Sequence, residues 1–242
     1  MPLQPVTRRS VPDEVYDQLL GELMEGDLAA GERLPSERRL AEVLGVSRPA
    51  VREALQRLSY AGYVDVRQGD TTTVRDFRQE GGLDLLPRLL VSGGRLDLAV
   101  ARSILEARAY VGPRIAQLAA ERAGAKLTGP LQQALEQLES DADPVARQRA
   151  ALAYWQVLVN GADSIAFRLM FNSMRAAYLP LLDALASVMS AEVEQIETYR
   201  HLAEAVSAGR GDAAHERATQ LLAAATELLT STIDSLRQGE PS

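Results

Sequence analysis

The chain of 242 residues has a formal net charge of −7 and no cysteine, which excludes disulfides and thiolate metal sites and favours a reducing, cytoplasmic compartment. Its uncharged apolar runs are far shorter than the ~18–20 residues of a membrane span, and its N-terminus lacks the apolar stretch of a secretory signal. Aromatic residues make up only 5% of the chain, so the core must consist mainly of Leu, Ala and Val, which favours helix packing.

Positive charge is concentrated in one segment of the chain. Residues 38–78 contain eight arginines and five acidic residues, a local balance of +3, so the remainder carries −10. The net charge of −7 argues against a protein that coats nucleic acid nonspecifically. The distribution of the charge indicates instead a basic binding head joined to a different, acidic module.

Three short helices are predicted near the N-terminus. Apolar residues recur at helical spacing between residues 12 and 25. Ser36 and Ser47 are candidate N-caps for two further helices, which end near Gly45 and Gly62. Because only the tripeptide Gly-Val-Ser joins the second helix to the third, the two must cross at a large angle, as in a helix-turn-helix.

A hairpin is predicted directly after these helices. The stretch YVDVRQGDTTTVRDF alternates, is rich in Val and Thr, and has QGDT at its middle. Three helices followed by a hairpin form a winged helix-turn-helix, to which we assign residues 1–77. Residues 78–84, RQEGGLD, are predicted to be a linker.

The remainder, residues 85–242, is predicted to be all-helical. Short breaks with Gly, Pro or Asp separate seven helical segments, the first of which begins close to the linker. One of these segments is predicted to run unbroken from residue 164 to 189. This pattern predicts an antiparallel bundle of ~150 residues. The expected fold class is therefore mainly α, an N-terminal winged helix-turn-helix plus a C-terminal antiparallel helical bundle.

The third helix has the features of a recognition helix. Its apolar residues fall on one side of a helical wheel, which leaves Arg48 and Arg52 exposed near its N-terminus. Arginine can donate two hydrogen bonds to guanine in the major groove, so these residues are candidates for base contacts. The alternative is that they solvate a surface helix and pair with Glu53 or Glu42.

The sequence resembles a known family over most of its length. The stretch ERLPSERRLAEVLGVSRPAVREALQRLSYAGYVDVRQGDTTTV looks like the DNA-binding domain of the GntR family, and the all-helical remainder looks like its FadR branch. VRDFRQEGGLDLLPRLL is similar to the linker and first effector-domain helix of that branch. The chain is also similar to the mycobacterial repressors of mammalian-cell-entry operons. The resemblance implies a DNA-binding regulator with a helical effector domain.

Carried over by position, the resemblance assigns DNA contacts on two elements. On the helix-turn-helix they are Arg38, Ser47, Arg48, Pro49, Ala50 and Arg52. At the wing they are Gln68 and Gly69, with Thr72 beside them, in the minor groove. Pro49 and Ala50 replace hydroxyl residues of the branch, so contacts there should be apolar or absent.

The resemblance also predicts that this chain lacks a metal site. Many members of the branch hold a divalent metal through an Asp and three His, with the Asp one helical turn before a His. Here Ala151 and Trp155 stand at those two positions, and Tyr199 and Ala223 at the other two. The chain contains only two His in total, so a site with three His is impossible by count. We expect no metal and no cofactor.

Aromatic residues at the same positions indicate an apolar effector site instead. Tyr154, Trp155 and Tyr199 would enlarge the apolar centre of the bundle, where small-molecule sites of helical bundles lie. Arg102 matches a family position that often faces the effector, and the resemblance implies a fatty acid or acyl-CoA. The alternative is that the aromatics are core and Arg102 pairs with Glu106 one turn away.

Together these features predict a regulator, and no pattern indicates an enzyme. Neither HExxH, GxSxG nor a glycine-rich phosphate loop is present. We expect a homodimeric repressor that binds an inverted-repeat operator in double-stranded DNA and is released by a small lipid-like effector. The alternative is a DNA-binding regulator or architectural protein without an effector, which would show steep salt sensitivity and little sequence preference.

Overall fold

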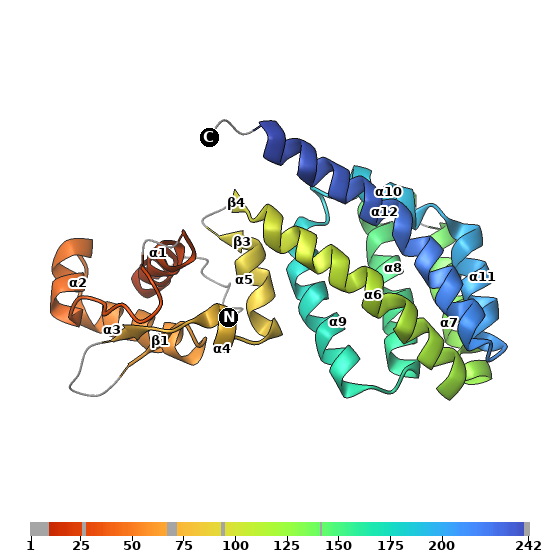
Figure 1. The fold of residues 1–242 in the computed structure, drawn as a ribbon, viewed down its shortest axis with the longest axis horizontal. Coiled ribbons are helices and arrows are strands. Elements are labelled where there is room, and N and C mark those ends of the chain that lie inside the picture. Colours follow the sequence, from red (N-terminus) through yellow and green to blue (C-terminus); the bar gives the residue numbers. More distant parts are fainter. Residues whose placement is uncertain (1–9, 26–27, 67–71, 93–94, 141, 240–242) are drawn as a thin grey trace, which may run out of the picture. The chain divides into compact units, whose positions relative to one another are not determined.

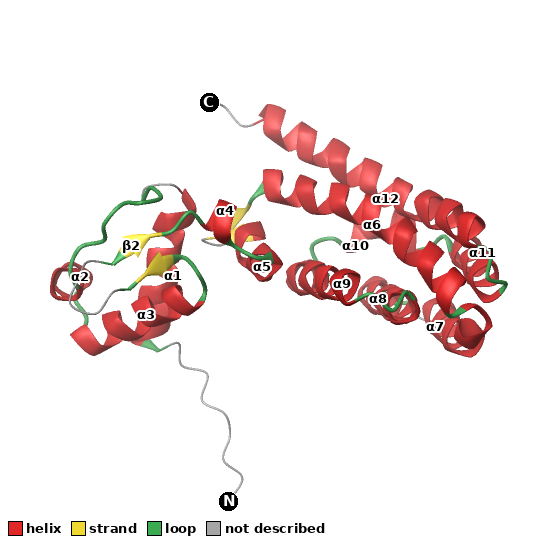
Figure 2. Ribbon diagram, turned by 60° about the horizontal axis from the view of Figure 1, so that its bottom comes forward, coloured by secondary structure: helices red, strands yellow, loops and turns green. Residues whose placement is uncertain are grey.

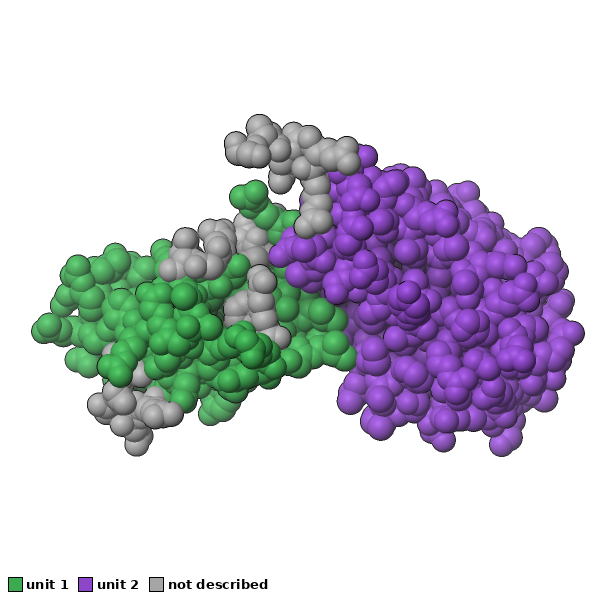
Figure 3. Space-filling view, in the orientation of Figure 1, with its two compact units in different colours: residues 1–96 green, residues 97–242 purple. Residues whose placement is uncertain are grey.

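The computed structural model describes residues 10–25, 28–66, 72–92, 95–140 and 142–239. The chain divides into two compact units, Met1–Leu96 and Asp97–Ser242 (Figure 3). Each has its own apolar core. The mainly helical class and the two-part architecture expected from the sequence are confirmed.

Three helices form the body of the first unit. They are α1 (Val11–Glu25), α2 (Glu37–Leu44) and α3 (Arg48–Tyr60) (Figure 1). The predicted caps are present, since the Ser36 hydroxyl accepts from the Arg39 N–H at 3.3 Å and the Ser47 hydroxyl from the Ala50 N–H at 3.4 Å. Gly45 ends α2 with a φ of 66°, a conformation that glycine adopts without strain.

The hairpin is built from β1 (Val64–Asp65) and β2 (Thr73–Val74), which pair antiparallel with Val64 opposite Val74 (Figure 2). The segment before α2 joins it, because Arg33 forms a bridge with Thr73 and the Leu34 N–H donates to the Thr72 carbonyl at 2.8 Å. The sequence predicts no strand in this segment. The alternating pattern is too short in this segment to be recognised.

The chain after the β1–β2 hairpin still belongs to the first unit. It forms α4 (Phe77–Glu80), a 3-10 turn (Leu83–Leu85), α5 (Leu86–Leu90) and a second hairpin of β3 (Val91–Ser92) and β4 (Arg95–Leu96). Leu85 is buried in the same core as α1 and α3, and Arg88 donates to the Tyr16 hydroxyl. The boundary between the compact units therefore falls after Leu96, beyond the predicted linker at 78–84. The sequence predicts only helix after residue 85, so the β3–β4 hairpin differs from that prediction.

The second unit is a helical bundle. Its helices are α6 (Leu98–Arg122), α7 (Thr128–Ser140), α8 (Pro144–Gly161), α9 (Ile165–Tyr178), α10 (Ala186–Val193), α11 (Ile196–Ser207) and α12 (Gly211–Gly239). The long helices α6 and α12 run side by side (Figures 1 and 2). The predicted helix at 164–189 is instead two helices, since a 3-10 turn at Leu179–Leu181 that contains Pro180 separates α9 from α10. None of the described helices is both long and apolar enough to cross a bilayer.

Candidate nucleic-acid interface and effector site

Helix α3 divides into a buried face and an exposed face. Val51, Leu55 and Leu58 are buried in the core of the first unit, whereas Arg48 and Arg52 are exposed. Among the described residues, Arg48 makes no hydrogen bond or ion pair. Its guanidinium is therefore available to a ligand without first giving up a protein contact.

Arg52 is held by a carboxylate on the preceding helix. Its Nε lies 3.0 and 3.2 Å from the two carboxylate oxygens of Glu37, and its Nη2 lies 2.7 Å from Oε2. This hydrogen bonding lowers the pKa of Glu37, with a smaller contribution from the charge of Arg48. The ion pair that the sequence analysis offered as an alternative for Arg52 is present, but with Glu37 in place of Glu53 or Glu42.

The arginines of α2 are more loosely held. Arg38 and Arg39 lie 3.7 and 3.5 Å from Glu42, and the Arg38 side chain is 76% exposed. Exposed pairs of this kind contribute little free energy, about 0–1 kcal/mol. Both guanidinium groups are accessible to phosphate oxygens.

The remaining DNA-contact positions differ in accessibility. Ser47 and Pro49 are exposed at the start of α3, although the Ser47 hydroxyl is engaged as the cap. Ala50 is only 6% exposed and Thr72 is 8% exposed, so neither side chain is presented on the surface of the free unit. Gln68 and Gly69 lie outside the described residues.

The three aromatic residues predicted for the effector site come together in the second unit. The rings of Tyr154 and Tyr199 meet edge to face with centroids 4.9 Å apart, and the Tyr154 hydroxyl donates to the Tyr199 carbonyl at 3.0 Å. Trp155 belongs to the same core. A Cβ on Gly112 would lie 3.4 Å from the Trp155 ring and 2.5 Å from Leu222, so α6 approaches this cluster closely because residue 112 is glycine.

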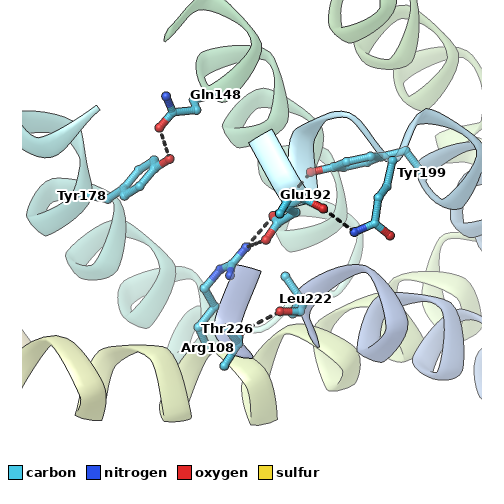
Figure 4. A network of polar contacts seen from close by, with 9 residues as sticks. Arg108, Gln148, Tyr178, Glu192, Tyr199, Leu222 and Thr226 are labelled. Atoms are coloured by element: carbon cyan, nitrogen blue, oxygen red, sulfur yellow. Dashed lines mark hydrogen bonds and ion pairs between the residues drawn. The ribbon is translucent and has the colours of Figure 1, made fainter. Parts of the chain in front are cut away.

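Arg102 has a different neighbourhood from the one expected. It forms an ion pair with Asp234 on α12, not with Glu106. A second arginine of α6, Arg108, contacts the cluster instead, through an ion pair with Glu192 of α10 (Figure 4). Arg108 precedes Gly112 and Ile115 on the core-facing stripe of α6, and this spacing was the signal by which the sequence could have revealed it.

Glu192 connects this arginine to the aromatic residues. Its Oε1 lies 2.5 Å from Arg108 Nη2 and accepts from the Tyr199 hydroxyl at 3.5 Å. Burial raises the pKa of Tyr199 well above its ordinary value, and the negative charge of Glu192 adds to the effect. The hydroxyl therefore stays protonated and can donate a hydrogen bond.

A second polar contact lies in the same network (Figure 4). Tyr178 of α9 donates to Gln148 of α8, and Gln148 in turn donates to the Leu182 carbonyl at 3.0 Å. Burial raises the pKa of Tyr178, so its hydroxyl also remains a donor. These contacts tie the segment between α9 and α10 to α8.

The positions at which other members of the branch hold a metal carry no metal-binding pattern here. Ala151, Trp155 and Tyr199 are buried residues of the core. His201 and His215 are both exposed. Within the ranges that the structure describes, no three His, Cys, Asp or Glu residues are grouped so that they could hold an ion.

Two family models match the chain. The model for bacterial regulatory proteins of the gntR family matches residues 12–74, and the FCD domain model matches residues 103–224. The chain belongs to the GntR family, in the branch with an FCD domain. This family consists of transcriptional regulators, so the GntR protein described here is a regulator and not an enzyme.

Curated relatives agree with this assignment. The HTH-type transcriptional regulator Mce2R of Mycobacterium tuberculosis is 53% identical over 97% of this chain and 98% of its own length. The fatty acid metabolism regulator protein of Vibrio cholerae is 32% identical over 39% of this chain and 34% of its own. Among solved structures, Lar of Listeria monocytogenes matches with a TM-score of 0.59 at 16% identity, over 93% of this chain and 99% of that one, which supports the fold alone.

Proposed function

We propose that this GntR regulator binds an inverted-repeat operator as a homodimer, represses transcription, and releases the operator when a small lipid-like effector binds its FCD domain. Such a protein acts where chromosomal DNA lies, in the cytoplasm. The observation that carries the DNA-binding proposal is the pair of exposed arginines, Arg48 and Arg52, at the N-terminal end of α3. Arginines at this end of a recognition helix can reach guanine edges in the major groove.

The proposed interface consists of the exposed residues around that helix. Arg48 and Arg52 contact bases, Pro49 packs against base edges, and Arg38 contacts a phosphate. Ser47 contributes through its place at the helix start, and Gln68 and Gly69 enter the minor groove at the wing. Ala50 and Thr72 are buried within the first unit, so we propose that they support the residues of the interface and do not contact DNA themselves.

Substitution of the two arginines tests the proposal. Arg48→Ala and Arg52→Ala should each weaken operator binding by ~1–3 kcal/mol, while binding to unrelated duplex DNA falls much less. Operator fragments would come from a footprint upstream of the protein's own gene, and affinities from titrations at fixed salt. Arg149→Ala, which removes an exposed charge from the second unit, is the matched control. Unchanged operator affinity of Arg52→Ala would contradict the assignment.

For the effector we propose a fatty acid or acyl-CoA that binds beside Tyr154, Trp155 and Tyr199. The apolar cluster supports this class, and so does the similarity to the Vibrio cholerae fatty acid metabolism regulator. Trp155 is the only tryptophan, so its emission reports on the cluster directly. Emission and operator affinity should both respond to acyl-CoAs or free fatty acids of some chain length. A lack of response at every length would show that the aromatics are only core.

A further inference from the structure

The contact between Arg108 and Glu192 is the most deeply placed ion pair of the described second unit. Glu192 is 1% exposed, and both of its carboxylate oxygens contact one nitrogen, Nη2, of Arg108. Its other described neighbour is the Tyr199 hydroxyl at 3.5 Å, which is at the limit of a hydrogen bond. The carboxylate is thus held mainly by one cation.

The surroundings offer more hydrogen-bond donors than Glu192 uses. Nη1 of Arg108 is buried and has no hydrogen-bond partner among the described residues, and Nε1 of Trp155 is buried with the Tyr199 hydroxyl as its nearest polar group. Buried N–H groups without an acceptor are unfavourable, and in native proteins they commonly mark a site for a ligand or water. A carboxylate has about four positions at which it can accept hydrogen bonds. A free carboxylate could therefore satisfy donors that the tethered carboxylate of Glu192 leaves unpaired.

The groups next to these donors are apolar. Tyr154, Tyr199 and Leu222 are fully or almost fully buried around Trp155 and Gly112. A ligand that combines an anionic head with a hydrocarbon body matches a cation with an unpaired N–H group beside such a wall. A neutral lipid that displaced Glu192 would supply no charge for Arg108 and would leave a partly buried cation unpaired.

Helix α10, which carries Glu192, is short and lacks a side-chain cap at its N-terminal end. It spans Ala186–Val193, and the Gln195 side chain donates to the Ala191 carbonyl in its last turn at 2.6 Å. A 3-10 turn at Leu179–Leu181 precedes it, and no regular helix joins this turn to α10. Displacement of this segment breaks no long helix, although it also breaks the contact of Gln148 with the Leu182 carbonyl.

We propose that Arg108 forms the centre of an anion site which Glu192 occupies as a tethered internal ligand, and that a carboxylate-bearing apolar effector displaces Glu192 and frees α10. The exchange keeps Arg108 paired with one negative charge throughout, whereas opening without a ligand would leave a partly buried cation alone. A competing anion can bind Arg108 only after the Glu192 carboxylate has moved away. Glu192 therefore lowers the apparent affinity of Arg108 for every such anion. This inference rests on the proposed function, because it takes the ligand of Arg108 to be the effector proposed there.

Removal of the internal carboxylate provides the first test. Glu192→Ala should lower the midpoint of thermal unfolding, and sodium acetate should raise it again in a saturable way that sodium chloride at equal ionic strength does not reproduce. The double variant Arg108→Met/Glu192→Ala should show no such recovery. Glu139→Ala, which breaks the surface pair of Glu139 with Arg200, is the control for a nonspecific effect of acetate.

A second variant keeps the test valid if Glu192→Ala does not fold. Glu192→Gln retains the shape of the side chain, removes its charge, and should bind octanoate at least about tenfold more tightly than the wild type, as followed by Trp155 emission. Octanol, which has the same chain without the charge, should bind neither protein. If acetate fails to stabilise Glu192→Ala beyond chloride, or octanoate binds Glu192→Gln no better than the wild type, the anion site is refuted.

Operator affinity, measured in parallel, separates the two proposals. Carboxylate binding at Arg108 together with weakened operator binding supports the site and its regulatory role. Carboxylate binding with unchanged operator affinity supports the anion site and refutes its role in release. The Arg52→Ala variant should lose operator binding but still bind the carboxylate. That result would show that failure of the DNA-binding proposal and failure of the anion-site proposal can be told apart.

Discussion

Single arginines of this chain serve different purposes because their surroundings differ. Arg48 is exposed and makes no hydrogen bond or ion pair within the described part of the chain. Arg52, one turn later, is held in a defined position by Glu37. Arg108 is paired with a buried carboxylate. The same side chain is thus exposed in the first case, restrained by a surface ion pair in the second and paired inside the bundle in the third.

At this scale we predict that Glu37 limits nonspecific DNA binding. Phosphates must compete with Glu37 for Arg52, so Glu37→Gln should increase affinity for unrelated duplex DNA by up to about fivefold, the equivalent of one exposed ion pair. Operator affinity should rise less, because ordering of Arg52 by Glu37 is lost at the same time. Titrations of both DNA molecules at the same salt concentration give the ratio.

The control for this prediction is Glu53→Gln, which makes the same change in charge at an exposed position of α3 but leaves the Arg52 pair intact. The two variants should differ clearly in their ratio of operator to nonspecific affinity. Equal ratios would mean that only net charge matters and that the Glu37 contact has no role in selectivity.

At the scale of helices, Asp13 joins the start of α1 to the last turn of α3. Its carboxylate accepts from the Ser10 hydroxyl at 2.7 Å and the Ser10 N–H at 3.1 Å, and it lies 2.5 Å from Arg57. These contacts lower the pKa of Asp13 from 3.8 to about 2, with the Ser10 hydroxyl as the largest cause and Arg57 next. Arg57 also lies over the ring of Tyr16.

The lowered pKa predicts how this contact responds to pH. A carboxyl group whose pKa is lower in the folded state stabilises the fold above its unfolded pKa, and the contribution disappears as pH falls through the folded value. The difference in thermal stability between wild type and Asp13→Asn should therefore be constant above pH ~5 and shrink as pH falls from 3.8 to about 2. The exposed control Glu14→Gln should show no such shrinkage. A constant difference across this range would contradict the role of Asp13.

At the scale of the whole molecule, the winged unit has one recognition helix, which supplies few base contacts. We predict that two protomers bind one operator with two-fold symmetry, so disruption of one half-site should weaken binding at least about 100-fold. Sedimentation of the protein with operator duplex gives the number of protomers. One protomer per duplex, with equal affinity for a single half-site, would rule out the symmetric complex.

The second prediction for the whole protein concerns metal. Purified protein should contain far less than one zinc, manganese or nickel ion per chain, because Ala151, Trp155, Tyr199 and Ala223 supply no ligand where other members of the branch have Asp and His. Elemental analysis after dialysis measures the content directly. About one tightly bound transition metal per chain would overturn this expectation.

Local features of the fold were determined by the sequence alone. The caps Ser36 and Ser47, the stop at Gly45 and the apolar spacing of α1 act within a few residues, so the helix-turn-helix and its exposed arginines followed from the residue order. The family resemblance likewise identified the regulator and its two-part architecture. The same local reasoning failed at the turn Leu179–Leu181, where Pro180 interrupts an otherwise continuous helical pattern.

Only the tertiary structure decided which charged groups meet. Arg52 pairs with a residue 15 positions away, Arg108 with one 84 away, and Arg102 with one 132 away. The crossing of helices brings such groups together, and helical periodicity carries no information about it. The family resemblance named Arg102 as the polar residue of the effector site, and the packing of the second unit shows in addition that Arg108 and Glu192 lie beside the aromatic cluster.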